Sequence, residues 1–137
     1  MPTDIRLSLA NTPGAFAKAA RVLAEGGINI EGMASDIRPG ESWGYLHLLV
    51  DDLDAAAGVL EAQGHEILDI HDVDLIDADD RPGGMADICQ SYADRGENIE
   101  VLYICTKSRL AVGTESMRRT FDGRTTAETT YADRRRS

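Results

Sequence analysis

Two short segments of the chain combine a Pro-Gly pair with the start of an apolar helical pattern. They are residues 11–16 (Asn-Thr-Pro-Gly-Ala-Phe) and residues 80–85 (Asp-Arg-Pro-Gly-Gly-Met). Pro is favoured in the first turn of a helix, because its missing N–H costs nothing there, and Gly lets another group approach the main chain closely. Unpaired N–H groups and the helix dipole make such a terminus favourable for a small carboxylate. We interpret both segments as candidate anion sites, although a Pro-Gly helix start is more often purely structural.

The two segments belong to a tandem repeat. Pro13 and Pro82 are 69 positions apart, and the motif at 27–31 (Gly-Ile-Asn-Ile-Glu) returns at 96–100 (Gly-Glu-Asn-Ile-Glu) with the same offset. Two motifs that share one offset without a gap indicate duplication of a single unit. The Asn of the second motif can both donate and accept hydrogen bonds. Placed beside the turn, it would complete a site for the carboxylate and ammonium groups of a free amino acid.

The elements that must position these motifs follow from the apolar periodicity. The first copy predicts a strand at 5–9, a helix at 15–25, strands at 28–37 and 43–50, a helix from Leu53 to Gly64 and a strand at 67–70. The order βαββαβ predicts the ferredoxin-like arrangement, an antiparallel sheet with both helices on one face. We therefore expect an α+β protein of two tandem ferredoxin-like βαββαβ repeats.

The second copy has a weaker pattern. It predicts strands at 73–77 and 99–105, a helix at about 84–95 and a third strand from Leu110. After Met117 the apolar pattern fades, so the last helix and strand have no assignment and an incomplete second repeat is one expectation. We expect a first repeat at 4–72, a second at 73–121 and a disordered polar tail at 122–137.

Composition and charge exclude several classes of protein. The net charge is −10, and the excess of acid lies in the first 100 residues. Such a body repels phosphate backbones, so we expect no nucleic-acid partner, and the basic end at 134–136 is interpreted as a solvated tail. The chain has no apolar run of about 18 residues and no signal-peptide pattern, which indicates a cytoplasmic protein without a membrane partner. Cys89 and Cys105 are interpreted as reduced core thiols.

The spacing of Asn11, Pro13, Gly14 and Phe16, followed by residues 27–30 (Gly-Ile-Asn-Ile), resembles the ACT domain, the small ligand-sensing module of amino-acid metabolism. The resemblance covers residues 4–73 well and 73–117 moderately. It implies the βαββαβ fold, no catalysis, no cofactor and no bound metal. It also implies binding of an amino acid or related metabolite at an interface between paired domains. The chain is therefore expected to be a stand-alone tandem ACT protein, which acts as a homodimer and regulates an enzyme in trans.

The resemblance carries a set of ligand-binding candidates, position by position. They are Asn11, Pro13, Gly14, Ala15, Asn29 and Ile30 in the first copy, and Asp80, Gly83, Gly84, Asn98 and Ile99 in the second. The copies differ at the turn, where Asn11 is matched by Asp80 and Thr12 by Arg81. An Asp repels a ligand carboxylate and an Arg attracts it. We therefore expect the two turns to be inequivalent.

Several other residues are interpreted as structural, and two alternative functions have less support. His47 is interpreted as a surface residue, Trp43 as a packing aromatic of the sheet, and Asp72 with Asp74 as a solvated acidic edge rather than a cation site. A small glyoxalase-like metalloenzyme also consists of tandem repeats, but it needs metal ligands from both halves, and the second half has no histidine. An assembly scaffold with a vestigial ligand site stays open as a further alternative.

Overall fold

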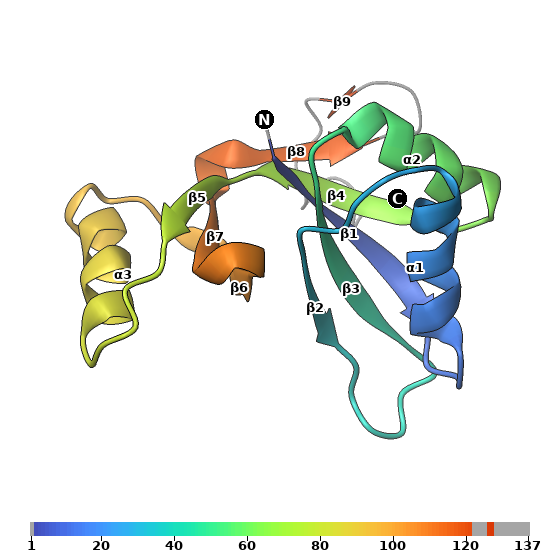
Figure 1. The fold of residues 1–137 in the computed structure, drawn as a ribbon, viewed down its shortest axis with the longest axis horizontal. Coiled ribbons are helices and arrows are strands. Elements are labelled where there is room, and N and C mark those ends of the chain that lie inside the picture. The colour runs from blue at the N-terminus through green and yellow to red at the C-terminus, as the bar shows by residue number, and fades with distance from the viewer. Residues whose placement is uncertain (1, 122–125, 128–137) are drawn as a thin grey trace.

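The first repeat forms a complete βαββαβ unit. The computed structural model describes residues 2–121 and 126–127. Four strands pair antiparallel in the order β2-β3-β1-β4, and α1 and α2 lie together over one face (Figure 1). The bounds are β1 (Thr3–Ala10), α1 (Ala15–Glu25), β2 (Gly32–Asp36), β3 (Trp43–Val50), α2 (Leu53–Ala62) and β4 (Ile67–Asp72). The predicted fold class is confirmed for this half of the chain.

The core of the first repeat lies between its sheet and its two helices. Ile5, Leu7 and Leu9 of β1 are buried against Leu23 of α1 and Leu60 of α2, as alternation along a strand with one buried face requires. Glycines bound the first helix: Gly14 precedes it with φ 87°, and Gly27 follows it with φ 74°. Asp52 caps the start of the second helix, because its Oδ1 accepts a hydrogen bond from the Ala55 N–H at 3.1 Å.

β2 is shorter than the sequence pattern predicts. It begins at Gly32, whereas the prediction placed the strand at 28–37. Ile28 and Ile30 instead pack against the core beneath the helices, and the segment joins the sheet where the Glu31 N–H donates to the Leu49 carbonyl at 2.9 Å. The apolar residues that suggested a strand are buried by the connection that leads into it.

The second repeat has a smaller sheet. Its strands pair in the order β5-β7-β6, and α3 packs on them through Tyr92, which contacts Leu110 and Val112. The bounds are β5 (Asp74–Asp77), α3 (Gly84–Asp94), β6 (Ile99–Cys105) and β7 (Arg109–Thr114). In Figure 1, α3 lies at the end of the molecule opposite α1 and α2. Within the described residues the second repeat is thus a βαββ unit without a second α-helix; two short 3-10 helices, η1 (Thr106–Ser108) and η2 (Glu115–Met117), flank β7.

The chain then returns to the first repeat. β8 (Arg118–Phe121) pairs antiparallel with β4, where Arg119 lies opposite Ile70, and β9 (Thr126–Ala127) extends the sheet from β8. The sequence pattern places 118–121 in the second repeat, but this strand hydrogen-bonds to the first sheet, because the outer edge of β4 is open to it. Apart from β9, the predicted tail at 122–137 lies outside the described residues.

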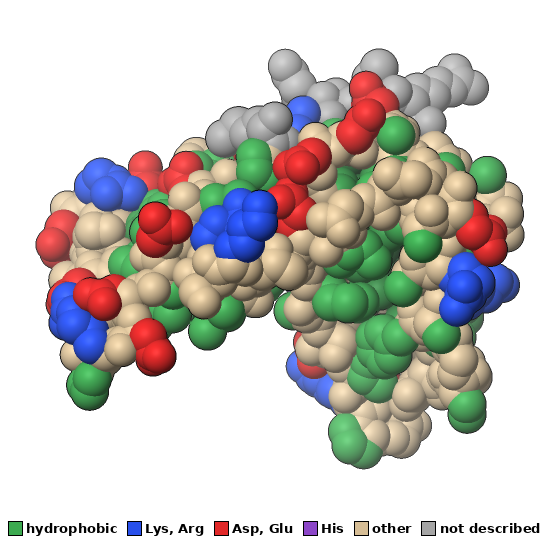
Figure 2. Space-filling view, in the orientation of Figure 1, with side chains coloured by type: hydrophobic (Ala, Val, Ile, Leu, Met, Phe, Trp, Pro, Cys, Tyr) green, Lys and Arg blue, Asp and Glu red, His purple; other side chains and the backbone are tan. Residues whose placement is uncertain are grey.

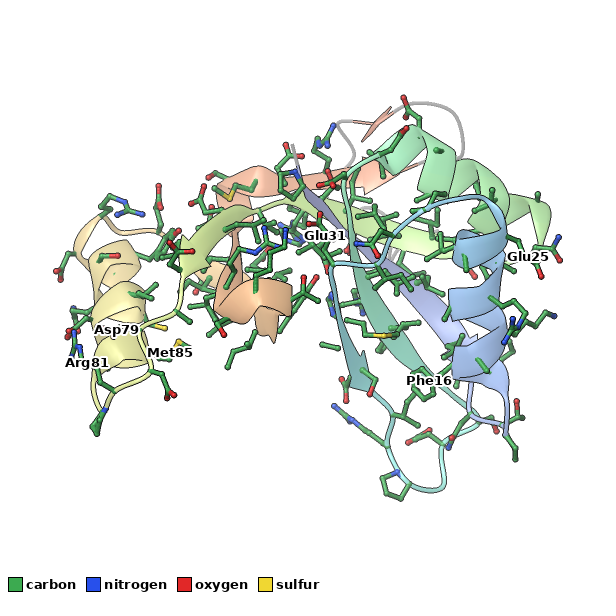
Figure 3. The ribbon with its side chains drawn as sticks, viewed as in Figure 1. Phe16, Glu25, Glu31, Asp79, Arg81 and Met85 are labelled. Carbon is green, nitrogen blue, oxygen red and sulfur yellow. The ribbon has the colours of Figure 1, made fainter. Side chains whose placement is uncertain are left out.

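The two repeats pack against each other through the sheet face that α1 and α2 leave uncovered. Leu49 and Val73 meet Cys105 and Ala111 there. At one margin, the Glu31 carbonyl accepts hydrogen bonds from both the N–H and the hydroxyl of Thr106, each at 2.9 Å (Glu31 is labelled in Figure 3). Both cysteines are unbridged, with Cys105 buried and Cys89 half-buried. No helix in the described part of the chain is long and apolar enough to cross a membrane.

Candidate functional site

A cavity of about 630 Å³ lies at the Pro-Gly turn of the first repeat. Its lining includes Pro13, Gly14 and Ala15, three of the residues singled out from the sequence. The end of β1 lies beside the turn in this lining, and the connection between α2 and β4 supplies Gln63, Gly64, His65 and Glu66. The turn is therefore one wall of a concave site rather than an isolated loop.

The turn presents the beginning of α1 to this cavity. Gly14 is in the left-handed conformation before the helix, and among the described residues no side chain caps the helix start. The Ala15 N–H donates to the Thr12 carbonyl at 3.2 Å, and the Lys18 N–H donates to the Gly14 carbonyl at 2.9 Å. The N–H groups of Phe16 and Ala17 come before Lys18, the first donor of the helix hydrogen-bond ladder, so the helix offers them no carbonyl acceptor. Both lie at the positive end of the helix dipole.

Charged side chains of both signs line the cavity. Lys18 extends from the first turns of α1, and Glu66 lies just before β4; both are exposed. Lys18 stands one helical turn after Gly14, so its ammonium group adds to the positive potential of the helix start. Glu66 supplies an acceptor for a cationic group. A small molecule with a carboxylate and an ammonium group matches this pair of charges.

His65 is the third titratable group of the lining. Burial lowers its pKa below the ordinary 6.5, and the nearby Lys18 cation lowers it further. The imidazole is therefore neutral at pH 7. Because the folded state binds this proton less tightly than the unfolded state, the associated stability is complete above pH 6.5 and is lost as the pH falls below it.

We expect His65→Gln to flatten the acid side of the stability profile. Between pH 7.5 and pH 5, urea unfolding should show a smaller decrease in the free energy of unfolding for the variant than for the parent chain. NMR titration of the His65 ring in the parent should give a midpoint below 6.5. A midpoint at or above 6.5, or identical profiles, would contradict this description of the site.

Trp43 lines the same cavity and corrects the sequence interpretation. Its side chain is 63% exposed, so it is not a packing aromatic of the sheet. As the first residue of β3, it shares the strand face of Tyr45 and His47, which points away from the helical core. With Leu9 and Ala10 of β1 it provides apolar surface next to the charged groups.

The comparisons with known proteins concern the fold. Neither a protein family nor a curated protein matches the sequence. Among solved structures, the regulatory subunit of aspartate kinase from Thermus thermophilus, in its ligand-free form, superposes with a TM-score of 0.63 at 24% identity, over 82% of each chain. Protein BT0572 from Bacteroides thetaiotaomicron gives 0.67 at 24% identity, over 82% of this chain and 76% of its own. The chain has the fold of a tandem ACT-domain protein.

Not every residue selected by the ACT resemblance lies at the cavity. The Asn11 side chain donates to the Glu41 carbonyl at 2.8 Å, which ties the turn to the loop between β2 and β3. Asn29 is exposed on the connection into β2, and Ile30 packs on the helical core. Ligand contacts for these three residues remain predictions, whereas Lys18 and Trp43, which line the cavity, are not among the candidates. Their spacing from Gly14 along the helix, and from Tyr45 along the strand, could have pointed to both.

At the Pro-Gly turn of the second ACT-like repeat, charged side chains of the turn and of α3 pair with one another. Arg81 donates to Asp79 at 2.6 Å and to Asp87 at 3.0 Å, and Asp79, Arg81 and Met85 lie together at α3 in Figure 3. A Cβ on Gly84 would collide with the Asp79 carbonyl, so this glycine serves close packing of the chain on itself. Acidic and basic side chains gather at the end of the molecule that holds α3 (Figure 2).

The remaining second-repeat candidates lie around this closed turn. Gly83 repeats the left-handed conformation of Gly14, with φ 89°. Asp80 is exposed, the Asn98 carbonyl accepts from the Glu115 N–H, and Ile99 packs against the core beneath α3. Position 87 matches Lys18 at the repeat offset of 69, but it holds an Asp. The two turns therefore differ in the sign of their charge, in line with the expected inequivalence.

Proposed function

We propose that this chain is a non-catalytic sensor that binds a free amino acid, or a closely related metabolite, at the Pro-Gly turn of its first repeat. The proposal rests on one observation: the cavity is lined on one side by an uncapped helix start and Lys18, which are positive, and elsewhere by the acidic Glu66. The two charged ends of an amino acid need groups of opposite sign a few ångströms apart, next to a surface for the side chain.

Each part of the ligand has a partner in this arrangement. The carboxylate accepts hydrogen bonds from the N–H groups of the first turn of α1 and pairs with Lys18. The ammonium group donates to Glu66. The side chain lies over Leu9, Ala10 and Trp43, where apolar area is available. The second turn has Arg81 paired with Asp79 and Asp87, so we assign the binding role to the first repeat.

A regulatory role in trans is the second part of the proposal. Two of the similar structures are regulatory subunits of aspartate kinase, from Thermus thermophilus and Thermus flavus. We infer that this chain likewise controls a separate enzyme of amino-acid metabolism, in the cytoplasm. Met33 on the edge strand β2 of the first sheet, with Leu102 and Ile104 on the edge strand β6 of the second, are exposed apolar side chains. They favour a homodimer as the working unit.

A thermal-shift screen against the twenty amino acids, repeated with divalent metals, tests the ligand. Binding to the folded state alone stabilises it by about 2.7 kcal/mol at 100 times the dissociation constant. We expect a selective rise in melting temperature with one or two amino acids. Lys18→Gln should reduce this rise strongly, because it removes a charge-assisted hydrogen bond worth about 1.5–3 kcal/mol.

Lys107→Gln is the matched control, since it removes an exposed lysine from the turn between β6 and β7, away from the cavity. Its shift should equal that of the parent chain. A shift produced by metal alone would contradict the sensor and favour the metalloenzyme. A melting temperature that no amino acid and no metal changes would leave the scaffold as the better description.

A further inference from the structure

A second cavity, of about 230 Å³, lies between the two repeats. It is lined by one apolar residue, Val101, and by six ionisable residues from both repeats. These are Arg6, His47, Asp69, His71, Glu100 and Arg118. The volume is roughly that of seven or eight water molecules in the liquid, so a single bridging water does not fill it.

The charged side chains of this cavity are arranged in pairs. Arg6 meets Asp69 at 3.3 Å, and the Glu100 carboxylate meets Arg118 at 3.4 Å and His71 Nε2 at 2.9 Å. Most of these groups are well shielded: the Asp69 side chain is 3% exposed and the His71 side chain 6%. Charged groups at such depth need partners for their remaining donors and acceptors.

Two of the shielded atoms lack such a partner. Asp69 Oδ1 and His71 Nδ1 are buried without a hydrogen-bond partner among the described residues. Asp69 Oδ1 is a carboxylate oxygen and can act only as an acceptor. Both atoms belong to β4, two residues apart on the same strand face. The strand that lines the cavity therefore has a carboxylate oxygen that needs a donor, next to a ring nitrogen without a partner.

The signs of the lining charges select the class of ligand. An isolated cation would be repelled by Arg6 and Arg118, and an isolated anion by Asp69 and Glu100. We propose that this cavity is a second binding site, between the repeats, for a small zwitterion of the size of glycine. Its ammonium group lies against the carboxylates of Asp69 and Glu100. Its carboxylate lies against Arg118 and Arg6.

Occupation of this site couples to the docking of β8. Arg118 belongs to β8, Asp69 and His71 to β4, and Glu100 to β6, so the ligand contacts both repeats and the strand that returns between them. Arg119 on β8 pairs with Asp72 on β4 at 2.6 Å beside the cavity. A bound zwitterion adds contacts across these joints and slows their opening.

The test uses glycine as the probe. Acetate and methylammonium, at equal ionic strength, are controls that each carry only one of the two charged groups of glycine. In the Lys18→Gln background, where the first-repeat site is impaired, glycine should shift the NMR signals of the His71 ring and of the Gly113 amide. Gly113 packs directly on His71. Neither half-molecule should do so at the same concentration. Protection of the β8 amides from hydrogen exchange should rise with glycine.

Asp69→Asn and Arg118→Gln should each weaken the glycine affinity about tenfold or more, because each removes a charge-assisted hydrogen bond. Arg95→Gln removes an exposed arginine at the end of α3, outside the cavity lining, and should leave the glycine affinity unchanged. Unmoved His71 and Gly113 signals at saturating glycine would overturn the proposal, as would equal shifts with acetate alone. If Arg118→Gln detaches β8 from β4, the loss of glycine affinity in Asp69→Asn alone tests the site. Shifts that appear in the parent but vanish in Lys18→Gln belong to the first-repeat site and also overturn it.

Discussion

Replacement of Asp4 by alanine is expected to lower the free energy of unfolding by about 2–5 kcal/mol. Asp4 is fully buried on β1, and its two carboxylate oxygens make hydrogen bonds to one residue of each repeat. His47 Nδ1 of the first repeat lies 2.9 Å from Oδ2, and the Tyr103 hydroxyl of the second donates to Oδ1 at 2.7 Å. The alanine leaves both partners without an acceptor. Urea unfolding at pH 7 measures the change.

Asp51→Ala is the control, because Asp51 is an exposed acid just after β3 and its loss should change stability by at most about 0.5 kcal/mol. Hydrogen exchange should place the largest loss of protection for Asp4→Ala in β6, which carries Tyr103. A change below about 1 kcal/mol, or an effect confined to the helices, would show that this bond does not hold the repeats together.

Gly32→Ala is expected to destabilise the protein by about 1–3 kcal/mol, through overpacking between the repeats. A Cβ at Gly32 would lie 2.6 Å from the Cys105 Cβ and 3.1 Å from a Tyr103 ring carbon. Since β2 and β6 meet at this point, the two sheets must separate locally to accept one methyl group. Chemical denaturation and the near-UV signal of Tyr103 report the change.

Gly58→Ala is the same substitution with the opposite expected sign. Gly58 lies inside α2 with nothing within 4 Å of the added Cβ, so alanine should stabilise the protein by about 0.5–1 kcal/mol through helix propensity. Destabilisation of both variants, or of neither, would contradict the close packing of β2 on β6.

Local patterns were sufficient for most of the fold. The first helix, α1, begins and ends where the Pro-Gly turn and Gly26-Gly27 place its ends, and β3 and β6 have the predicted bounds. The glycine positions are informative because the chain needs positive φ at Gly14 and Gly27. The sequence also showed why the two turns differ, since Asp80 and Arg81 replace Asn11 and Thr12.

What the sequence did not show depends on contacts between distant segments. His47 is half-buried rather than a surface residue, because the second repeat covers it and its Nδ1 is hydrogen-bonded to the Asp4 carboxylate. β8 joins β4 through an open edge and the pairing of Arg119 with Asp72, which no local pattern contains. The cavity at the first turn likewise depends on Glu66 and His65, more than 50 residues after Gly14.

The most direct test of the proposed sensor is an NMR titration that follows the turn amides of both repeats in one sample. With the amino acid selected by the thermal-shift screen, the amides of Gly14, Ala15 and Phe16 should shift and saturate together with that ligand. The amides of Gly83 and Gly84, at the turn occupied by Arg81, should stay in place. Equal shifts at both turns, or shifts at neither, would contradict a ligand site at the first Pro-Gly turn.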